Sequence, residues 1–324
     1  MKNLVCIIAG EPNSINSELI GKIWRKKDSF KDLNVFIIGS YSLIKKQFKQ
    51  IGIRINIKKI SGIQKQNFKK ELLIYDVPLK FKKPFKVSSK TKSKYIIKCL
   101  KLGIELARKK KVSGLINCPI NKGETFGDNF TGITEFLAKK ERVSGKEAML
   151  IYNKELSVSP ITTHIKVGQI SKKISKKLII NKLLTINEFF LKKLKFKPRI
   201  GLLGLNPHNY ELRKNSEERK IIIPAIKKLK KKNIFVKGPL SGDTAFLDFK
   251  KKKIDVLVGM YHDQVLSPFK ALYKFDAVNI TLGLPYIRVS PDHGIGKEII
   301  KKNLANPKSL LQSIKFFKNI NVRT

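Results

Sequence analysis

Residues 200–231 read IGLLGLNPHNYELRKNSEERKIIIPAIKKLKK and contain one complete strand–loop–helix pattern. The apolar run Ile200–Leu205 predicts a buried strand, and the loop after it contains His208. The stretch Glu217–Lys231 carries apolar residues at helical spacing among lysines, which predicts an amphipathic helix. Buried strands that alternate with amphipathic helices are typical of α/β architecture.

The same alternation runs along all 324 residues, a length that suits two packed α/β lobes. Further strands are predicted at Leu4–Ile8, Val35–Ile38, Gly114–Asn117, Ala148–Tyr152, Ser159–Thr162, Ile234–Val236 and Val256–Gly259. Further helices are predicted at Glu18–Arg25, Lys94–Lys109, Ile133–Val143, Ile170–Lys193 and Ser309–Phe317. Because there is no internal repeat and no low-complexity linker, a continuous two-lobed enzyme fits better than tethered domains.

The formal net charge of +45 raises the question of a nucleic-acid partner. Only nine of the 69 basic residues are Arg, the side chain best suited to bidentate contacts with phosphates and bases. The lysines are spread in short clusters along the whole chain, as on solvated helix faces. A nucleic-acid-binding protein is therefore a remote alternative, and we expect the charge to attract small anionic substrates at low salt.

The sequence also predicts a compartment. No apolar run approaches the roughly 18–20 residues that a membrane span needs, and the N-terminal run ends at Gly10-Glu11-Pro12, as a buried strand does and a signal peptide does not. The three cysteines, Cys6, Cys99 and Cys118, are far apart and form no C-x-x-C pair. These features favour a cytoplasmic protein with reduced thiols and no membrane partner.

The chain contains four histidines, each just after a predicted strand or in a turn-rich loop: His164, His208, His262 and His293. Any one alone is more often a hydrogen-bonded structural histidine than a ligand. Three imidazoles at strand ends, far apart in sequence, match a catalytic metal site with open positions for substrate. Asp263 is placed to orient the ring of His262. Spacing alone leaves both interpretations open.

Candidate anion-binding residues form a second set. Lys270, Asn279 and Arg288 are suited to a phosphate and a carboxylate, although a solvated side chain is the alternative for Lys270. At the predicted helix start at Ile133, the Thr134 hydroxyl and backbone N–H groups form either an anion site or an ordinary N-cap. No G-x-G-x-x-G, P-loop or G-x-S-x-G motif follows a predicted strand.

A series of motifs in order along the chain is similar to that of one enzyme family. The motifs are G-E-P from Gly10, C-P-I-N-K from Cys118, G-I-T-E-F-L-A from Gly132, T-T-H ending at His164, G-L-N-P-H ending at His208, G-P-L-S-G-D-T from Gly238, Y-H-D-Q-V-L-S-P-F-K from Tyr261, and V-N-I-T-L-G-L-P-Y-I-R ending at Arg288, followed by D-H-G. Together they resemble the 4-hydroxythreonine-4-phosphate dehydrogenase family of vitamin B6 (pyridoxine) biosynthesis. The match extends from Gly10 to Gly294, nearly the whole chain.

The resemblance implies an oxidoreductase whose fold is like that of isocitrate and isopropylmalate dehydrogenases. This is an α/β fold with two α/β/α lobes and the active-site cleft between them. The first lobe is expected over residues 1–128 plus about 285–324, and the second, which carries the metal ligands, over 129–284. The resemblance also implies a homodimer whose partners share each metal site.

The family's functional residues carry over by motif. The metal ligands are His164, His208 and His262, for one divalent ion per site such as zinc, magnesium or cobalt. The substrate-binding positions are Ile133, Thr134, Lys270, Asn279 and Arg288. The catalytic candidates are Asp243 and Lys270, and the positions near NAD or NADP are Asp292, His293 and Gly294.

The implied reaction oxidises the secondary alcohol of 4-phosphooxy-L-threonine with NAD⁺ or NADP⁺. The product, 2-amino-3-oxo-4-phosphooxybutanoate, loses CO₂ to leave 3-amino-2-oxopropyl phosphate. A divalent metal would stabilise the alkoxide and then the enolate, while Lys270 and Arg288 neutralise the anionic ends of the substrate. The proton acceptor stays open between Asp243 and a metal-bound water. A metal-dependent hydrolase using the same histidines is a remote alternative.

Three departures from the family pattern bear on the choice of substrate. Ile133 stands where the family has a substrate-contacting His, a loss of about 1–3 kcal/mol if the facing group stays unpaired. The loop Gly10–Glu18 lacks two glycines and a proline of the family pattern, and Ile295-Gly296 replaces Thr-Ala on the expected cofactor side. The alternative is a paralogous dehydrogenase of a related phosphorylated hydroxy acid, such as 4-phosphoerythronate or 4-phosphothreonate.

Overall fold

The computed structural model describes residues 3–322 apart from 128–129, 131 and 275. The chain forms two compact units. Unit 1 comprises residues 1–135 and 285–322, and unit 2 comprises residues 136–284. The boundary expected between residues 128 and 129 falls on positions outside the described part of the chain.

Unit 1 is built on a parallel sheet with the strand order β3-β4-β2-β1-β5-β12. The strands are β1 (Leu4–Ile8), β2 (Asn34–Gly39), β3 (Ile57–Ile60), β4 (Leu72–Asp76), β5 (Gly114–Asn117) and β12 (Arg288–Pro291). Every residue of β1 and β5 is buried, as expected for parallel strands that helices cover on both faces. All strands of a parallel sheet end at the same edge, so the loops after β1, β5 and β12 lie together.

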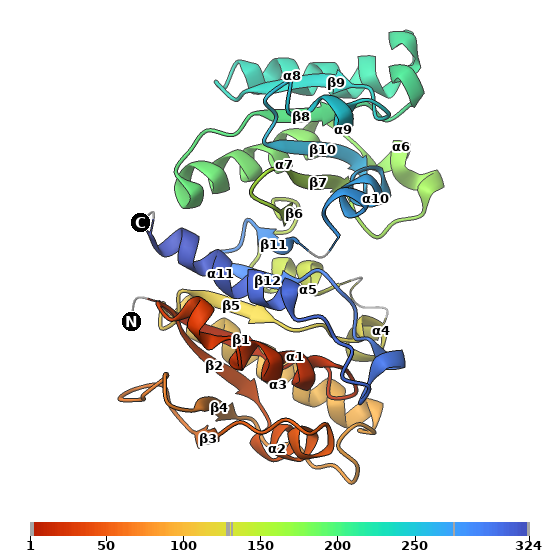
Figure 1. Ribbon diagram of the computed structural model, residues 1–324. Helices are drawn as coiled ribbons and strands as arrows, with labels where there is room; N and C mark the ends of the chain where they lie inside the picture. Colours follow the sequence, from red (N-terminus) through yellow and green to blue (C-terminus); the bar gives the residue numbers. More distant parts are fainter. Residues whose placement is uncertain (1–2, 128–129, 131, 275, 323–324) are drawn as a thin grey trace. The chain divides into compact units, whose positions relative to one another are not determined.

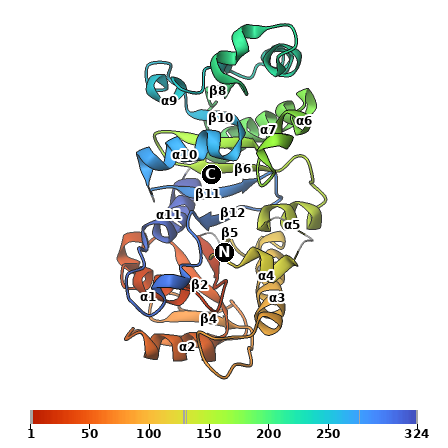
Figure 2. The ribbon, with the colours of Figure 1, turned by 90° about the vertical axis from the view of Figure 1, so that its right-hand side faces the viewer.

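Helices cover both faces of this sheet (Figures 1 and 2). On one face lie α1 (Asn16–Trp24), α2 (Tyr41–Gln50) and α11 (Lys308–Val322), and on the other lies α3 (Ser89–Arg108). The short helix α4 (Lys122–Phe126) follows β5, and α5 (Ile133–Lys140) begins in unit 1 and continues into unit 2. Gly103 lets α3 approach the sheet closely, because a Cβ at this position would lie 2.8 Å from Ile8 Cδ1.

Unit 2 contains six strands in the order β11-β6-β7-β10-β8-β9. The strands are β6 (Ala148–Tyr152), β7 (Ser157–Thr162), β8 (Ile200–Leu203), β9 (Val236–Leu240), β10 (Val256–Tyr261) and β11 (Val278–Leu282). The pairs β11–β6 and β6–β7 are antiparallel, and β7, β10, β8 and β9 are parallel. The four parallel strands therefore present their carboxyl ends at one edge.

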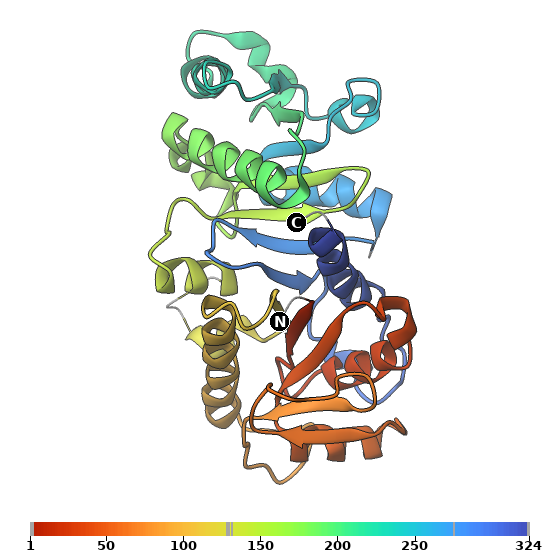
Figure 3. The same cartoon turned by 90° about the vertical axis from the view of Figure 1, so that its left-hand side faces the viewer.

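The helices of unit 2 are α6 (Ile170–Lys173), α7 (Lys176–Phe189), α8 (Ile223–Lys230), α9 (Ala245–Asp248) and α10 (His262–Tyr273). In Figure 3, α7 (green) lies across the face of the sheet turned to the viewer, and the blue α10 lies behind it. Leu203, Val265 and Phe269, each 0% exposed, belong to the apolar core of the unit. Full burial of a side chain of this size contributes roughly 1.5–3 kcal/mol.

The α/β class predicted from the sequence is confirmed, and β1, β5 and β6 have the predicted bounds. The helix predicted at Ile170–Lys193 is wrong as one element, because it breaks at Ile174 and restarts where Ser175 Oγ caps Leu178 N at 3.2 Å. The strand predicted at Ile234–Val236 starts only at Val236. Over the described residues, the structure has no helix both long and apolar enough to cross a membrane.

Candidate functional site

The carboxyl edge of the parallel strands in unit 2 gathers four of the predicted site residues. His164 follows β7, His262 follows β10, His208 lies in the loop after β8, and Asp243 lies in the loop after β9. Ligands of open α/β sheets bind at this edge. Four strands far apart in sequence therefore deliver three imidazoles and a carboxylate to one end of the unit.

His164 and His262 come closest. Their ring centroids lie 5.8 Å apart with an interplanar angle of 40°. Nδ1 of His262 lies 2.7 Å from Oδ1 of Asp263, so the carboxylate orients this ring and favours the tautomer with the proton on Nδ1, which leaves the lone pair of Nε2 available to a metal. Imidazole nitrogens bind zinc at about 2.0–2.1 Å, and two rings at this separation can reach a common ion. The donor set thus fits a divalent metal of the zinc or cobalt type.

His208 does not complete this pair within one chain. In the described part of the chain, no three His, Cys, Asp or Glu side chains lie close enough together to hold a metal ion. His208 begins a left-handed stretch of backbone, with φ values of 47° to 57° from His208 to Leu212. Non-glycine residues pay roughly 1–2 kcal/mol each for this conformation, so the surrounding contacts must hold the loop in place.

Asp243 sits in the loop after β9 and is exposed. The pKa of its carboxyl lies below the ordinary value, mainly because of the Ser241 hydroxyl, with a smaller lowering by His208. The carboxylate is therefore ionised at neutral pH and lies within electrostatic reach of an imidazole.

Two predicted substrate-binding residues lie elsewhere in unit 2. The segment after His262, predicted to be a turn, is the helix α10, and Lys270 lies on it about 12 Å along the axis from His262. Pro268 inside this helix hides it from sequence patterns, because proline ordinarily ends a helix. Asn279 lies in β11, and its Oδ1 is buried with no hydrogen-bond partner among the described residues. This buried acceptor is available to a hydrogen-bond donor of a bound molecule.

Arg288 is a buried cation of unit 1. It is 3% exposed at the start of β12, and its Nε donates to Asn117 Oδ1 at 2.5 Å. Burial lowers the pKa of the guanidinium to about 10, while the charges of Tyr286 and Glu135 act to raise it. The group stays cationic at neutral pH. A fixed, desolvated guanidinium is suited to bind a carboxylate or phosphate.

Ile133 and Thr134 begin α5, as the sequence predicts. The Ile133 side chain is only 6% exposed, so its apolar surface is packed away from water. A residue in this state offers a substrate no hydrogen bond. The substrate contact that the family pattern assigns to a histidine at position 133 is therefore absent from this side chain.

The predicted cofactor residues Asp292, His293 and Gly294 follow β12 at the carboxyl edge of unit 1. Ser309 Oγ accepts a hydrogen bond from the Asp292 backbone N–H at 2.8 Å, which ties this loop to α11. Space is open at Gly294, where an added Cβ would have no neighbour within 4 Å. The edge and the open space are compatible with a bound cofactor.

Sequence patterns missed a buried ionic cluster beside this loop. Lys92 Nζ lies 2.7 Å from Glu11 Oε1 and 2.8 Å from Glu124 Oε2. The side chains of Lys92 and Glu11 are 3% and 0% exposed. In the sequence, only Glu11 in the G-E-P motif pointed to this cluster. No pattern distinguishes Lys92 from the many exposed lysines of the chain.

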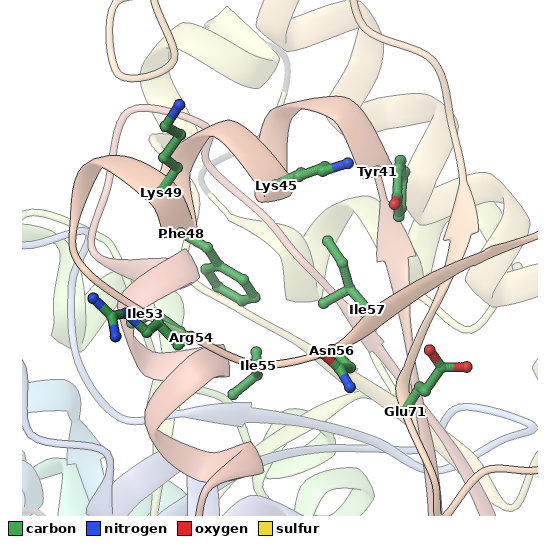
Figure 4. A pocket seen from close by; sticks show the side chains of 10 residues that line it. All are labelled: Tyr41, Lys45, Phe48, Lys49, Ile53, Arg54, Ile55, Asn56, Ile57 and Glu71. Carbon is green, nitrogen blue, oxygen red and sulfur yellow. The ribbon is translucent and has the colours of Figure 1, made fainter.

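Unit 1 also has a hollow of about 720 Å³ between α2 and β3 (Figure 4). Phe48 lies near its centre, Ile55 and Ile57 flank it, and Lys49 and Arg54 extend away from it. None of the predicted site residues lines it.

The three cysteines are not candidates for ligands or nucleophiles. Cys6, Cys99 and Cys118 are free and buried, and burial raises the pKa of each thiol to about 12. They are therefore protonated at neutral pH and are poor ligands and nucleophiles.

Comparison with known proteins agrees with the motifs. The chain is 39% identical over 318 residues to a 4-hydroxythreonine-4-phosphate dehydrogenase of Sulfurihydrogenibium sp. (strain YO3AOP1). The match covers 96% of each chain. It is 33% identical over 320 residues to a D-threonate 4-phosphate dehydrogenase of Salmonella typhimurium, covering 96% of this chain and 97% of that one. A solved structure of 4-hydroxythreonine-4-phosphate dehydrogenase from Klebsiella pneumoniae superposes with a TM-score of 0.85 at 27% identity and covers 99% of this chain and 100% of that one.

The family model of the pyridoxal phosphate biosynthetic protein PdxA matches residues 31–317. This span includes all three predicted metal ligands and every predicted substrate position. The chain therefore belongs to the PdxA family.

Proposed function

We propose that this protein oxidises 4-phosphooxy-L-threonine with NAD⁺ or NADP⁺ and a divalent metal ion. The product, 2-amino-3-oxo-4-phosphooxybutanoate, then decarboxylates to 3-amino-2-oxopropyl phosphate. The observation that carries the proposal is the pair His164 and His262. Their ring centroids lie 5.8 Å apart at the carboxyl ends of parallel strands, in a chain that belongs to this family.

His164, His208 and His262 would hold the metal, and Asp263 keeps His262 in the tautomer with Nε2 free. When bound, the ion supplies Lewis-acid stabilisation of negative charge that develops on oxygen during oxidation and decarboxylation. Asp243, ionised and near His208, is the candidate to accept the hydroxyl proton. Lys270 is the second catalytic candidate, through its charge.

We assign substrate binding to polar side chains that are suited to bind an anionic group or a hydrogen-bond donor of the substrate. Arg288, cationic and buried, would bind one anionic end of the substrate. Asn279 offers its unpartnered buried oxygen to a donor such as the substrate ammonium. Thr134 and Lys270 complete the set by motif.

The nicotinamide cofactor, NAD or NADP, would bind beside Asp292, His293 and Gly294. The open space at Gly294 and the position of this loop at the carboxyl edge of unit 1 support the assignment. Zinc, magnesium and cobalt remain the candidate metals.

A homodimer with shared metal sites fits the histidine geometry. His164 and His262 of one chain form a pair, and no third donor joins them within the described residues. We propose that His208 of the partner subunit is the third ligand. The site would then exist only in the dimer, and we place the enzyme in the cytoplasm.

A second substrate deserves a direct test, because one relative acts by name on D-threonate 4-phosphate and Ile133 removes a usual substrate contact. The experiment incubates the purified enzyme with NAD⁺ or NADP⁺, a divalent metal and either 4-phosphooxy-L-threonine, 4-phosphothreonate or 4-phosphoerythronate. Reduced cofactor should form with 4-phosphooxy-L-threonine. Turnover of 4-phosphothreonate alone would reject that substrate in favour of the second.

A further inference from the structure

The loop that presents His208 is tied down at the residues just before the histidine. The Glu218 carboxylate is 0% exposed and lies under this loop. Its Oε1 accepts hydrogen bonds from Leu205 N at 2.8 Å and Asn206 N at 2.9 Å, and its Oε2 accepts one from Asn206 Nδ2 at 3.0 Å. Three donors within two residues of the loop thus converge on one buried carboxylate.

The same loop is also held by Gln264, at Gly204. Its Nε2 donates to the Gly204 carbonyl at 2.8 Å, while its Oε1 accepts from Met260 N at 2.6 Å. Gln264 lies in the first turn of α10, two residues after His262. One amide side chain therefore joins the end of β10 to the start of the loop after β8.

Two glycines make room for these contacts. A Cβ on Gly204 would lie 1.9 Å from Asn209 Oδ1, and a Cβ on Gly259 would lie 2.8 Å from Gln264 Oε1. A side chain at Gly259 would therefore displace Gln264, and one at Gly204 would displace Asn209 and come within 3.2 Å of Glu218 Oε1.

We propose that Glu218 and Gln264 are positioning residues that fix the placement of His208 as a metal ligand. The inference rests on the proposed metal site and adds two residues to it. The left-handed backbone from His208 to Leu212 is intrinsically unfavourable, so contacts elsewhere must hold it, and those of Glu218 and Gln264 lie at residues 204–206, just before His208. Groups that support metal ligands from behind typically change metal affinity 10–100-fold.

The test measures Co²⁺ binding to the full-length, metal-stripped protein by visible absorption and by calorimetry. Glu218→Gln removes the charge, and Gln264→Glu removes the donor to Gly204 but keeps the acceptor for Met260. Each should raise the Kd for Co²⁺ about tenfold or more. Activity should return at higher Co²⁺ concentration with an unchanged KM for substrate, which a general loss of structure would not allow.

Unit 2 supplies matched controls. Asp255 Oδ2 accepts from Arg199 N at 2.7 Å, so Asp255→Asn matches Glu218→Gln. Asn153 donates to the Asp276 carbonyl at 2.6 Å and accepts from Glu155 N at 2.9 Å, so Asn153→Asp matches Gln264→Glu. Both controls should bind Co²⁺ within about twofold of the wild type.

An unchanged Kd in both positioning variants would overturn the inference, as would an equal loss in the matched controls. If Glu218→Gln does not fold, Gln264→Glu alone decides. The failure of the underlying metal site has a different signature: wild-type protein that binds no Co²⁺, or His208→Ala that binds it as tightly as the wild type.

Discussion

The backbone N–H of Ile15 donates a hydrogen bond to the carbonyl of Ile295 at 3.2 Å. This contact joins the two loops of unit 1 that depart from the family pattern, Gly10–Glu18 and Ile295-Gly296. The side chain of Ile15, 7% exposed, also lies where a Cβ on Gly296 would come within 2.8 Å of its Cδ1. The two segments that depart from the family pattern therefore contact each other beside the expected cofactor loop.

This packing predicts that Gly296→Ala destabilises the protein by about 1–3 kcal/mol, because φ at this position is +58° and the new methyl group meets Ile15. Gly52→Ala, with φ of +69° and no neighbour within 4 Å, should lose about 1 kcal/mol from the backbone alone. Gly62→Ala, with neither feature, should stay within about 0.5 kcal/mol. Denaturant unfolding measures all three, and equal values for Gly52 and Gly296 would remove Ile15 from the explanation.

The buried cluster around Lys92 predicts a large loss of stability on Lys92→Met. The change leaves the Glu11 carboxylate, 0% exposed, without its cation, a loss of about 3–5 kcal/mol. Lys109→Met breaks a pair whose side chains are 59% and 57% exposed, and it should lower the free energy of unfolding far less, because solvent screens an exposed ion pair. The free energy of unfolding of each variant provides the measurement; similar small losses would show that Glu11 finds another partner.

Glu218 predicts an acid-sensitive component of stability. Burial raises the pKa of its carboxyl, but hydrogen bonds from Asn206 and Leu205 outweigh burial, so the pKa lies below its ordinary 4.5. A carboxyl with a depressed folded-state pKa contributes stability above the unfolded value, and loses it as pH falls through the folded one. Below about pH 5, the wild type should lose stability more steeply than Glu218→Gln. Parallel stability–pH curves for the two proteins would contradict this assignment.

The histidine geometry predicts which inactive subunits rescue each other. If His208 serves the partner's site, a purified heterodimer of His208→Ala and His262→Ala subunits retains one complete set of ligands. It should show about half the activity of the wild-type dimer. A heterodimer of His164→Ala and His262→Ala subunits should be inactive, because these two rings pair within one chain. Rescue by the second combination, or none by the first, would refute the proposed sharing.

The strand ends were predictable from the sequence, because apolar runs of the right length are bounded by polar, turn-forming residues. His164, His208 and His262 each follow such a run, and the structure places all three loops at one edge of unit 2. The local sequence pattern is sufficient to predict this placement, because the carboxyl ends of parallel strands lie at the same edge of a sheet.

The contacts that fix these loops were not predictable in the same way. Gln264 reaches Gly204 across 60 residues, and a single glutamine carries no periodic signal. Glu218 lies in the first turn of the helix predicted at Glu217–Lys231, and only folding places Leu205 and Asn206 over it. The helix α10 was hidden by Pro268, which packing of Leu266 and Phe269 in the core offsets. Such features depend on tertiary contacts rather than on local propensity.

The most direct test follows reduced nicotinamide cofactor formed from 4-phosphooxy-L-threonine by metal-stripped enzyme, before and after a divalent metal is restored. The wild type should be inactive when stripped and active when Zn²⁺, Co²⁺ or Mg²⁺ is added back. His164→Ala, His208→Ala and His262→Ala should each remain inactive and fail to bind metal. Undiminished turnover by the stripped enzyme, or metal binding retained in all three variants, would contradict the three-histidine metal site.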